Sequence, residues 1–188
     1  MKKYLCFTWL KTVLNDSMKK IKVLKVLPAL IFIMTFSGLA GQQPERLKDA
    51  LIVLDEEEGS NLGSLVKDVY PTIILQNGNH VIAGKETPSQ DILKAYCSAS
   101  SVNMLYQDNP QFEKVELIKL TINSSEETWV DIDLSQLNNF PLLKYVYLRF
   151  TYDACNGLSD SCLENIVREM VTGTNNRIKV VYELSILE

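Results

Sequence analysis

Three apolar runs in the second half of the chain predict β-strands at residues 115–122, 143–152 and 178–185. Each run is rich in Val, Ile, Leu, Tyr and Phe, residue types that favour strands. Apolar side chains alternate along each run with side chains of mixed polarity, so one side of every strand is apolar and the other is partly polar. Parallel strands that are buried on both faces read as unbroken apolar runs, which these are not. The alternation therefore predicts a sheet with one face wet, or covered only by the region around residues 71–83.

A helix is predicted between the second and third strands, at residues 159–171. Its apolar stripe, capping box and C-terminal glycine are formed by Leu163, Ile166, Val167, Met170, Val171, Ser161, Glu164 and Gly173. A strand, a helix and a second strand in this order form a parallel, right-handed βαβ unit in nearly all proteins. The longer link between the first and second strands is expected to cross the sheet in the same way, through residues 134–139.

The segment before residue 72 predicts two helices. Apolar residues at helical spacing predict the first helix over residues 44–54. The acidic run at 55–58 is expected to be a solvated loop that ends this helix. A short second helix is predicted over residues 61–70, where Pro71 stops it.

Two further elements are predicted before residue 107. An Asn-Gly pair at 77–78, the strongest short-range signal for a two-residue turn, joins the β-favouring runs 72–75 and 80–83 into a hairpin. Residues 87–90 then form a capping box. Because apolar residues at helical spacing follow this capping box, we expect a helix over residues 92–106.

Residues 134–148 resemble one unit of a leucine-rich repeat, because Leu143, Val146 and Leu148 have the spacing of its strand. Thr151 stands where such repeats carry an Asn or Cys, and no second clean copy is present. The resemblance therefore implies shared β/α architecture and not membership of the family. With the elements above, the sequence predicts a single α/β or α+β domain. Its mixed sheet would contain a C-terminal parallel βαβ unit, with helices mainly on one face, plus a β-hairpin.

The first 41 residues contain the pattern of a secretory signal peptide. Seven of the 19 basic residues lie before position 26, against one acid, Asp16. An uncharged apolar run of 14 residues follows from Val26 to Leu39 and leads into a stretch of small residues. This order predicts export, with cleavage after Ala40 or Gly41. The run is shorter than the roughly 20 residues that span a bilayer, although an uncleaved signal anchor stays as the alternative.

The basic segment of this signal peptide is unusually long if the protein starts at residue 1. A start at Met18 would place lysines directly before the apolar run, so Met18 is the favoured initiator and a long basic segment is the alternative. The predicted organisation is an upstream extension at 1–17, a signal peptide at 18–41 and one exported globular domain at 42–188. This domain would reside in the periplasm or outside the cell. It would contact the membrane only through the uncleaved signal segment.

Charge excludes one class of partner. Removal of residues 1–41 leaves 12 basic residues (19 minus 7) and 22 acidic ones (23 minus 1), a formal net charge of −10. Such an acidic surface repels phosphate backbones, so no nucleic-acid partner is predicted. The composition of 46% hydrophobic and 22% charged residues is that of a globular protein and excludes a disordered or collagen-like chain.

The exported chain would keep three cysteines, Cys97, Cys155 and Cys162. Cys155 and Cys162 bracket a Gly-containing loop and form the favoured disulfide, in a compartment that tolerates such bonds. In the alternative, all three are small buried hydrophobes. An unpaired Cys97 would also allow a structural envelope protein that is linked to another chain. Because there is no Cys-x-x-Cys pair and His80 is the only histidine, neither a metal site nor a cofactor is predicted.

Candidate catalytic groups are few. An envelope hydrolase that uses His80 with an acidic or Ser partner is the alternative function, but the Gly-x-Ser-x-Gly motif of many hydrolases is missing. Asp131 and Asp133 would share one side of an extended strand, as a catalytic pair or as Ca²⁺ ligands. Their alternation with Val130 and Ile132 favours two solvent-facing acids instead. The sequence therefore favours a protein without enzymatic activity.

A binding face is the leading functional prediction. Alternation puts Tyr145, Tyr147 and Arg149 on the less apolar side of the middle strand, and Tyr and Arg are enriched at binding hot spots. Neighbouring strands would add Lys119, Lys179 and Glu183 to the same face. In the alternative, the hairpin region or the N-terminal helix covers these side chains. We therefore expect a non-catalytic module that binds an unknown protein or envelope ligand through this face.

Overall fold

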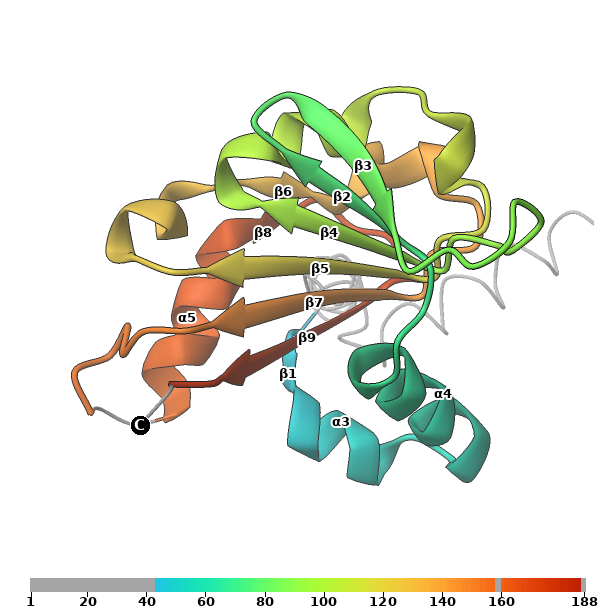
Figure 1. Ribbon diagram of the computed structural model, residues 1–188. Coiled ribbons are helices and arrows are strands. Elements are labelled where there is room, and N and C mark those ends of the chain that lie inside the picture. Colours follow the sequence, from blue (N-terminus) through green and yellow to red (C-terminus); the bar gives the residue numbers. More distant parts are fainter. Residues whose placement is uncertain (1–42, 158–159, 187–188) are drawn as a thin grey trace, which may run out of the picture. The chain divides into compact units, whose positions relative to one another are not determined.

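The computed structural model describes residues 43–157 and 160–186 of the chain. The predicted upstream extension and signal peptide, including the cleavage site, lie outside the described residues. In the described part, the centre is a seven-stranded sheet in the order β1-β9-β7-β5-β4-β2-β3 (Figure 1). All neighbouring strands are parallel except β2 and β3, which form an antiparallel hairpin. The predicted α/β class with a mixed sheet is confirmed.

The strands of the main sheet are β1 (Glu45–Arg46), β2 (Thr72–Gln76), β3 (Asn79–Ala83), β4 (Lys94–Ser98), β5 (Leu117–Ile122), β7 (Tyr145–Phe150) and β9 (Lys179–Leu184). A second, small sheet pairs β6 (Ile132–Asp133) with β8 (Val171–Thr172). The strands β5, β7 and β9 lie within the three apolar runs, so the prediction that these runs form strands is confirmed. From β2 to β9 the parallel strands follow one another across the sheet in chain order, so each connection leads to the next strand.

The connections between these strands are short helices. They are the 3₁₀ helices η2 (Ala99–Tyr106), η3 (Pro110–Phe112), η4 (Ser125–Trp129) and η5 (Leu134–Asn139), and the α-helix α5 (Asp160–Met170). Apolar side chains of η2, η3, η5 and α5 pack with Ile118, Leu148 and Val180 of the strands in the main core. The helix α5 joins the parallel strands β7 and β9, which confirms the predicted βαβ unit. The predicted connection through residues 134–139 is also present: these residues form η5, which lies between β5 and β7 in the chain.

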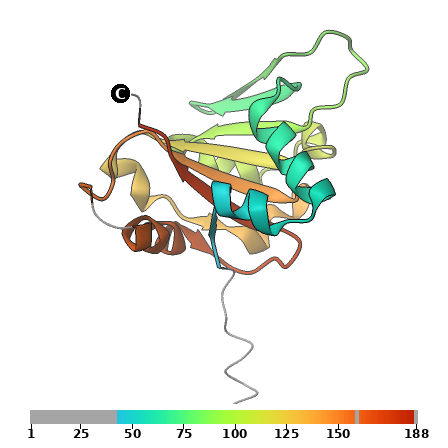
Figure 2. The same ribbon diagram turned by 90° about the horizontal axis from the view of Figure 1, so that it is seen from below.

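Two helices cover part of the opposite face of the sheet, which we call the second face. They are α3 (Leu47–Val53) and α4 (Glu56–Lys67), and both lie apart from α5 in the two views of Figures 1 and 2. Four of their side chains pack with Leu117, Tyr145, Tyr147 and Val181 in a second core. The helices are therefore mainly on one face, as predicted, and the second face is partly covered by this N-terminal pair.

The acidic run at 55–58 is part of a helix, so its prediction as a solvated loop is wrong. Asp55 is the N-cap of α4, and its carboxylate accepts a hydrogen bond of 2.8 Å from the backbone N–H of Glu58. The three glutamates that follow stand in the first turn of α4, where negative charge interacts favourably with the helix dipole. Acidic residues in sequence thus mark the start of a helix here.

The predicted helix over 92–106 is also wrong, because its first half is the strand β4. Gln90 behaves as the capping box predicts, since its side-chain oxygen accepts the N–H of Thr87 at 3.3 Å, but no helix follows. Instead β4 pairs with β2 and β5, which buries Ala95 and Cys97 in the main core. Strand pairing on both sides outweighs a capping signal and a helical spacing that the same residues also satisfy.

The predicted hairpin is confirmed at the other end of the sheet. Asn77 and Gly78 both have positive φ angles, 54° and 76°. This is the backbone of the two-residue turn that an Asn-Gly pair favours. The turn fixes the register of β2 and β3, with Gln76 opposite Asn79 and Thr72 opposite Ala83.

Candidate functional site

Side chains on the second face lie in three rows across the strands, because aligned residues of neighbouring parallel strands point to the same side. The first row, at the amino ends of the strands, holds Thr72, Lys94, Leu117, Tyr145 and Lys179. The second row holds Ile74, Tyr96, Lys119, Tyr147 and Val181. The third row, toward the carboxyl ends, holds Ser98, Thr121, Arg149 and Glu183.

The first row is covered by α3 and α4. Tyr145 is only 3% exposed and belongs to the second core. Lys94 is 2% exposed, and its ammonium group donates a 2.6 Å hydrogen bond to the backbone carbonyl of Asp68, directly after α4. At the end of the row, Lys179 forms an ion pair of 2.7 Å with Glu58 of α4. Tyr145 therefore lies on the covered part of the predicted binding face, whereas Lys179 stays exposed at the edge of that part.

The second and third rows extend beyond the two covering helices. Seven side chains of these rows are partly exposed. Six of them form a surface that we call the open face, and it consists of Ile74, Tyr96, Lys119, Thr121, Arg149 and Glu183, whereas the seventh, Ser98, hydrogen-bonds to Ser101. Tyr147 forms the floor of this surface, because it is 2% exposed and packs in the second core. The predicted wet face thus exists on the carboxyl half of the sheet. The layer that covers the other half is the N-terminal helix pair and not the hairpin.

Lys119 is at the centre of the open face. Its Nζ lies 4.9 Å from the centre of the Tyr96 ring and 5.7 Å from that of Tyr147, within the range of cation–π contacts. Burial lowers the pKa of Lys119, the Arg149 guanidinium lowers it further, and Glu183 raises it. Of the side chains that the structure describes, no carboxylate lies within ion-pair distance of this ammonium group.

The polar groups around Lys119 are held by their own hydrogen bonds. The Tyr147 hydroxyl donates to the Glu183 carboxylate, and Arg149 Nη2 donates to the Ser185 hydroxyl at 2.8 Å. Burial raises the pKa of Tyr147, and the hydrogen bond to Glu183 raises it further, so this phenol stays a neutral donor at physiological pH. The arrangement offers fixed cations and aromatic rings for binding.

Sequence reasoning missed Tyr96 and Ile74, which complete the open face on the β4 and β2 side. The helical spacing of residues 92–106 wrongly places Tyr96 on a helix. The missed signal is the alternation in Lys94-Ala95-Tyr96-Cys97-Ser98, where small apolar residues alternate with larger or polar ones. Its period of two is that of a strand with one face in the core.

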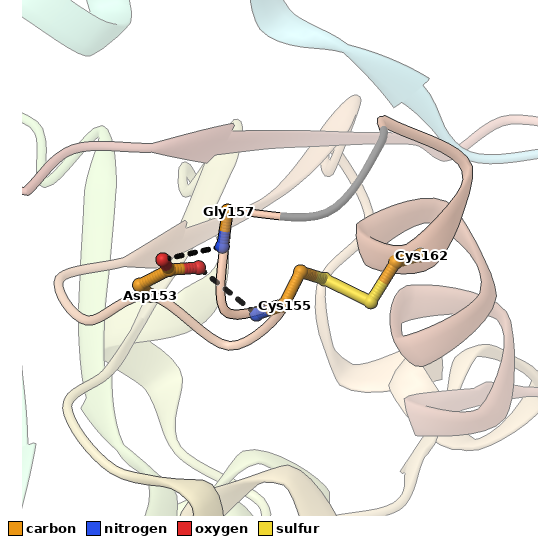
Figure 3. Close-up of a disulfide and its surroundings, with 4 residues drawn as sticks. All are labelled: Asp153, Cys155, Gly157 and Cys162. Atoms are coloured by element: carbon orange, nitrogen blue, oxygen red, sulfur yellow. Dashed lines mark hydrogen bonds between the residues drawn. A yellow bond between two sulfur atoms is a disulfide. The ribbon is translucent and has the colours of Figure 1, made fainter.

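The structure contains the predicted disulfide between Cys155 and Cys162, with the two Cα atoms 6.1 Å apart. Figure 3 shows that the bond ties the loop after β7 to the first turns of α5. In the same loop, the Asp153 carboxylate accepts hydrogen bonds from the backbone N–H groups of Cys155 and Gly157 at 3.1 and 2.7 Å. This cluster orders the loop and lies outside the three rows of the second face.

Cys97 is the free cysteine among the described residues. Its side chain is buried in the main core, and burial raises the pKa of its thiol to about 12. A buried, protonated thiol reacts poorly, because the thiolate is the reactive form. The position of Cys97 therefore argues against its use in a bond to another chain.

The residues considered for catalysis or metal binding lie away from the open face or hold structure in place. His80 is exposed on the edge strand β3, and no hydrogen bond or ion pair joins it to another described side chain. The Asp131 carboxylate accepts from the Thr172 hydroxyl at 2.6 Å. Asp133 caps η5, where hydrogen bonds from Ser135 and Gln136 lower its pKa. Among the described residues, no group of three or more His, Cys, Asp or Glu is placed to hold a metal ion.

The fold and the site together define an α/β protein with a mostly parallel sheet and a partly uncovered, cationic and aromatic sheet face. No protein-family model matches the chain, and neither does any curated protein or solved structure. Within residues 43–157 and 160–186, none of the helices has the length and apolar character needed to cross a membrane.

Proposed function

We propose that the protein is an exported, non-catalytic binding module that binds a protein partner through the open face. One observation carries this proposal: α3 and α4 leave uncovered the half of the second face where Tyr96, Lys119 and Arg149 gather. A sheet face that served only to pack a helical layer would be apolar along its whole length. Aromatic residues and Arg on an uncovered surface are typical of binding hot spots.

Preorganisation supports the same function. Lys119 is placed between the rings of Tyr96 and Tyr147, and Arg149 is anchored to Ser185. Long cationic side chains lose much conformational entropy when a partner immobilises them. Because these contacts already restrict the side chains before binding, the entropic cost of association is smaller.

Export is part of the proposal and rests on two observations. The first 41 residues carry the pattern of a signal peptide. Independently, Cys155 and Cys162 are joined in a disulfide, a bond that persists in oxidising compartments and is rare in the cytosol. The open face would therefore meet its partner in the periplasm or outside the cell.

The proposal is tested by capture of partners from an envelope extract of the native host. The exported protein is compared with a variant that carries Tyr96→Ala and Arg149→Ala. The matched control is Lys144→Ala, which removes an exposed cation on the amino side of β7 that pairs with Glu116 at 2.7 Å. All three proteins must first show the same melting temperature.

A partner that is retained by the parent and the control, and lost by the open-face variant, is the expected result. Retention by all three proteins would mean that another surface binds, and the proposed site would be wrong. Capture of nothing by the parent would contradict the proposed function itself.

A further inference from the structure

The open face also indicates the chemistry of its partner. Resting on the proposed function, we propose that the open face binds an acidic polypeptide segment, whose carboxylates pair with Lys119 and Arg149. The partner's apolar side chains would then contact Tyr96 and Ile74. Three features of the open face support an acidic partner: its charge, the geometry of its two cations and the apolar strip beside them.

The charge of the open face is opposite to that of the rest of the exported chain. Residues 42–188 carry 12 basic and 22 acidic residues, by the counts 19 minus 7 and 23 minus 1. The open face carries two cations, Lys119 and Arg149, against one carboxylate, Glu183. That carboxylate already accepts a hydrogen bond from Tyr147. Cationic charge on this surface is therefore incompletely balanced, in a protein that is acidic elsewhere.

The two cations are placed to share one anion or to hold two neighbouring ones. Lys119 is aligned with Tyr147, two residues before Arg149 on the adjacent strand, so the cations are diagonal neighbours. Diagonal neighbours in a sheet have Cα atoms on the order of 7 Å apart. The positive charge of Arg149 disfavours the charged form of Lys119 and lowers its pKa. A carboxylate between them would offset this repulsion and replace the water that burial has removed from Lys119.

An apolar strip extends the site in one direction. Tyr96 and Ile74 continue the second row from Lys119 toward the edge of the sheet, and Ile74 is aligned with Val81 on β3. Val81 is 62% exposed. With neighbouring strands about 4.8 Å apart, the surface from β3 to β7 spans on the order of 20 Å. A surface of that width with cations at one end and apolar groups at the other fits a polypeptide segment better than a free small anion.

The test uses the exported protein and two short peptides with blocked ends, polyglutamate and polyglutamine. Binding is followed by the backbone amide signals of Lys119, Thr121 and Arg149 in nuclear magnetic resonance spectra at low and physiological salt. The variants are Lys119→Gln and Arg149→Gln, with Lys144→Gln as the control at an exposed cation outside the open face. Inorganic sulfate is titrated separately, to distinguish a peptide site from a site for small anions.

We expect polyglutamate, but not polyglutamine, to shift these signals. Each open-face variant should weaken binding by about tenfold, as loss of a charged contact typically does, and the control should not. Binding should also weaken as salt rises, because exposed charges are screened. Equal shifts with both peptides, no shift with polyglutamate, or displacement of polyglutamate by an equal concentration of sulfate would each overturn the proposal.

The outcome separates this inference from the proposed function. A partner that is captured through the open face, but that polyglutamate does not displace and salt does not weaken, would leave the proposed function standing and contradict the acidic ligand. If the open face captures nothing and polyglutamate does not bind, both proposals fail.

Discussion

The ammonium group of Lys119 on β5 lies 4.9 Å from the centre of the Tyr96 ring on the neighbouring strand β4. This pair links two strands on the half of the sheet that α3 and α4 do not cover. A cation–π contact at a partly exposed site contributes about 0.5–1 kcal/mol, enough to orient a lysine but not to hold a fold together. The pair is therefore better suited to presenting a charge than to stabilising the protein.

The first prediction concerns the ionisation of Lys119. Burial and then Arg149 lower its pKa, whereas Glu183 raises it. Arg149→Gln should therefore raise the pKa of Lys119, and Glu183→Gln should lower it, as measured by nuclear magnetic resonance of labelled lysine side chains. If both substitutions shift the pKa in the same direction, these charges do not act on Lys119 as described.

The lowered pKa of Lys119 also predicts how the stability of the fold changes with pH. Because the pKa of Lys119 is lower in the folded state, the stability linked to this group is fully present above the unfolded-state pKa. It is lost as the pH falls through the folded-state pKa. Arg149→Gln should reduce this dependence, which a comparison of urea unfolding at several alkaline pH values would measure.

Tyr147 is predicted to change the pH dependence of stability in the opposite direction to Lys119. Burial and the Glu183 hydrogen bond raise its pKa. The stability linked to this group is therefore fully present below the unfolded-state pKa of about 10 and is lost as the pH rises through the folded-state pKa. Tyr147→Phe should lose about 1 kcal/mol at neutral pH, for the missing hydrogen bond, and should lose less additional stability than the parent in alkaline urea titrations. A steeper alkaline loss in the variant would contradict this account.

The disulfide is predicted to stabilise the folded state by about 2–3 kcal/mol, because it closes a short loop in the unfolded chain. The variant with Cys155→Ser and Cys162→Ser should unfold at correspondingly lower urea concentration. A reducing agent should lower the stability of the parent toward that of the variant and leave the variant unchanged. Equal urea midpoints for parent and variant would show that the bond contributes nothing.

Lys94 and Lys67 are a buried and an exposed lysine, and their substitutions can be compared to test the packing over the first row. Lys94 is buried and donates to the carbonyl of Asp68, the residue directly after α4, whereas Lys67 is exposed at the end of α4. Lys94→Ala should cost about 2 kcal/mol, through lost packing and an unpaired carbonyl group, and Lys67→Ala at most about 0.5 kcal/mol. Similar losses in thermal unfolding would mean that the buried contact between Lys94 and Asp68 does not stabilise this end of the sheet.

Substitution of two glycines distinguishes the cost of a strained backbone from the cost of a steric clash. Gly78 has a φ of 76° with open space around it, and Gly173 has a φ of 67°. A Cβ atom on Gly173 would collide with the Asp133 carboxylate that caps η5. Gly78→Ala should therefore cost about 1 kcal/mol, and Gly173→Ala clearly more. The reverse order in denaturant unfolding would contradict the described packing of Gly173 against Asp133.

The parts of the fold that the sequence predicts are those in which local and tertiary signals agree. In β5, β7 and β9, strand-forming residues alternate in polarity, and the sheet uses that alternation directly. In β4 the signals compete, because Ile92, Tyr96 and Ala99 also fit helical spacing after a capping box. Only the pairing of β4 with β2 and β5, which involves residues distant in sequence, decides between the two.

The sequence predicts the open face only in part. Periodicity shows which side chains share a face of the sheet, but it does not show which of them other helices cover. Alternation correctly grouped Lys119, Tyr147, Arg149 and Glu183 on one side of adjacent strands. It could not show that the N-terminal helices stop short of Arg149 but cover Tyr145, since both residues lie on the same side of β7. It also omits Tyr96, because helical spacing predicts a helix at this residue.

Site-specific photocrosslinking in the native host tests whether a partner binds at the open face. A photoreactive residue replaces Thr121, which lies in the third row between Ser98 and Arg149, or Thr174, an exposed threonine beyond β8. We predict a crosslinked product at Thr121 that is missing at Thr174. Equal products at both positions, or no product at Thr121 in a folded and exported protein, would contradict binding at the open face.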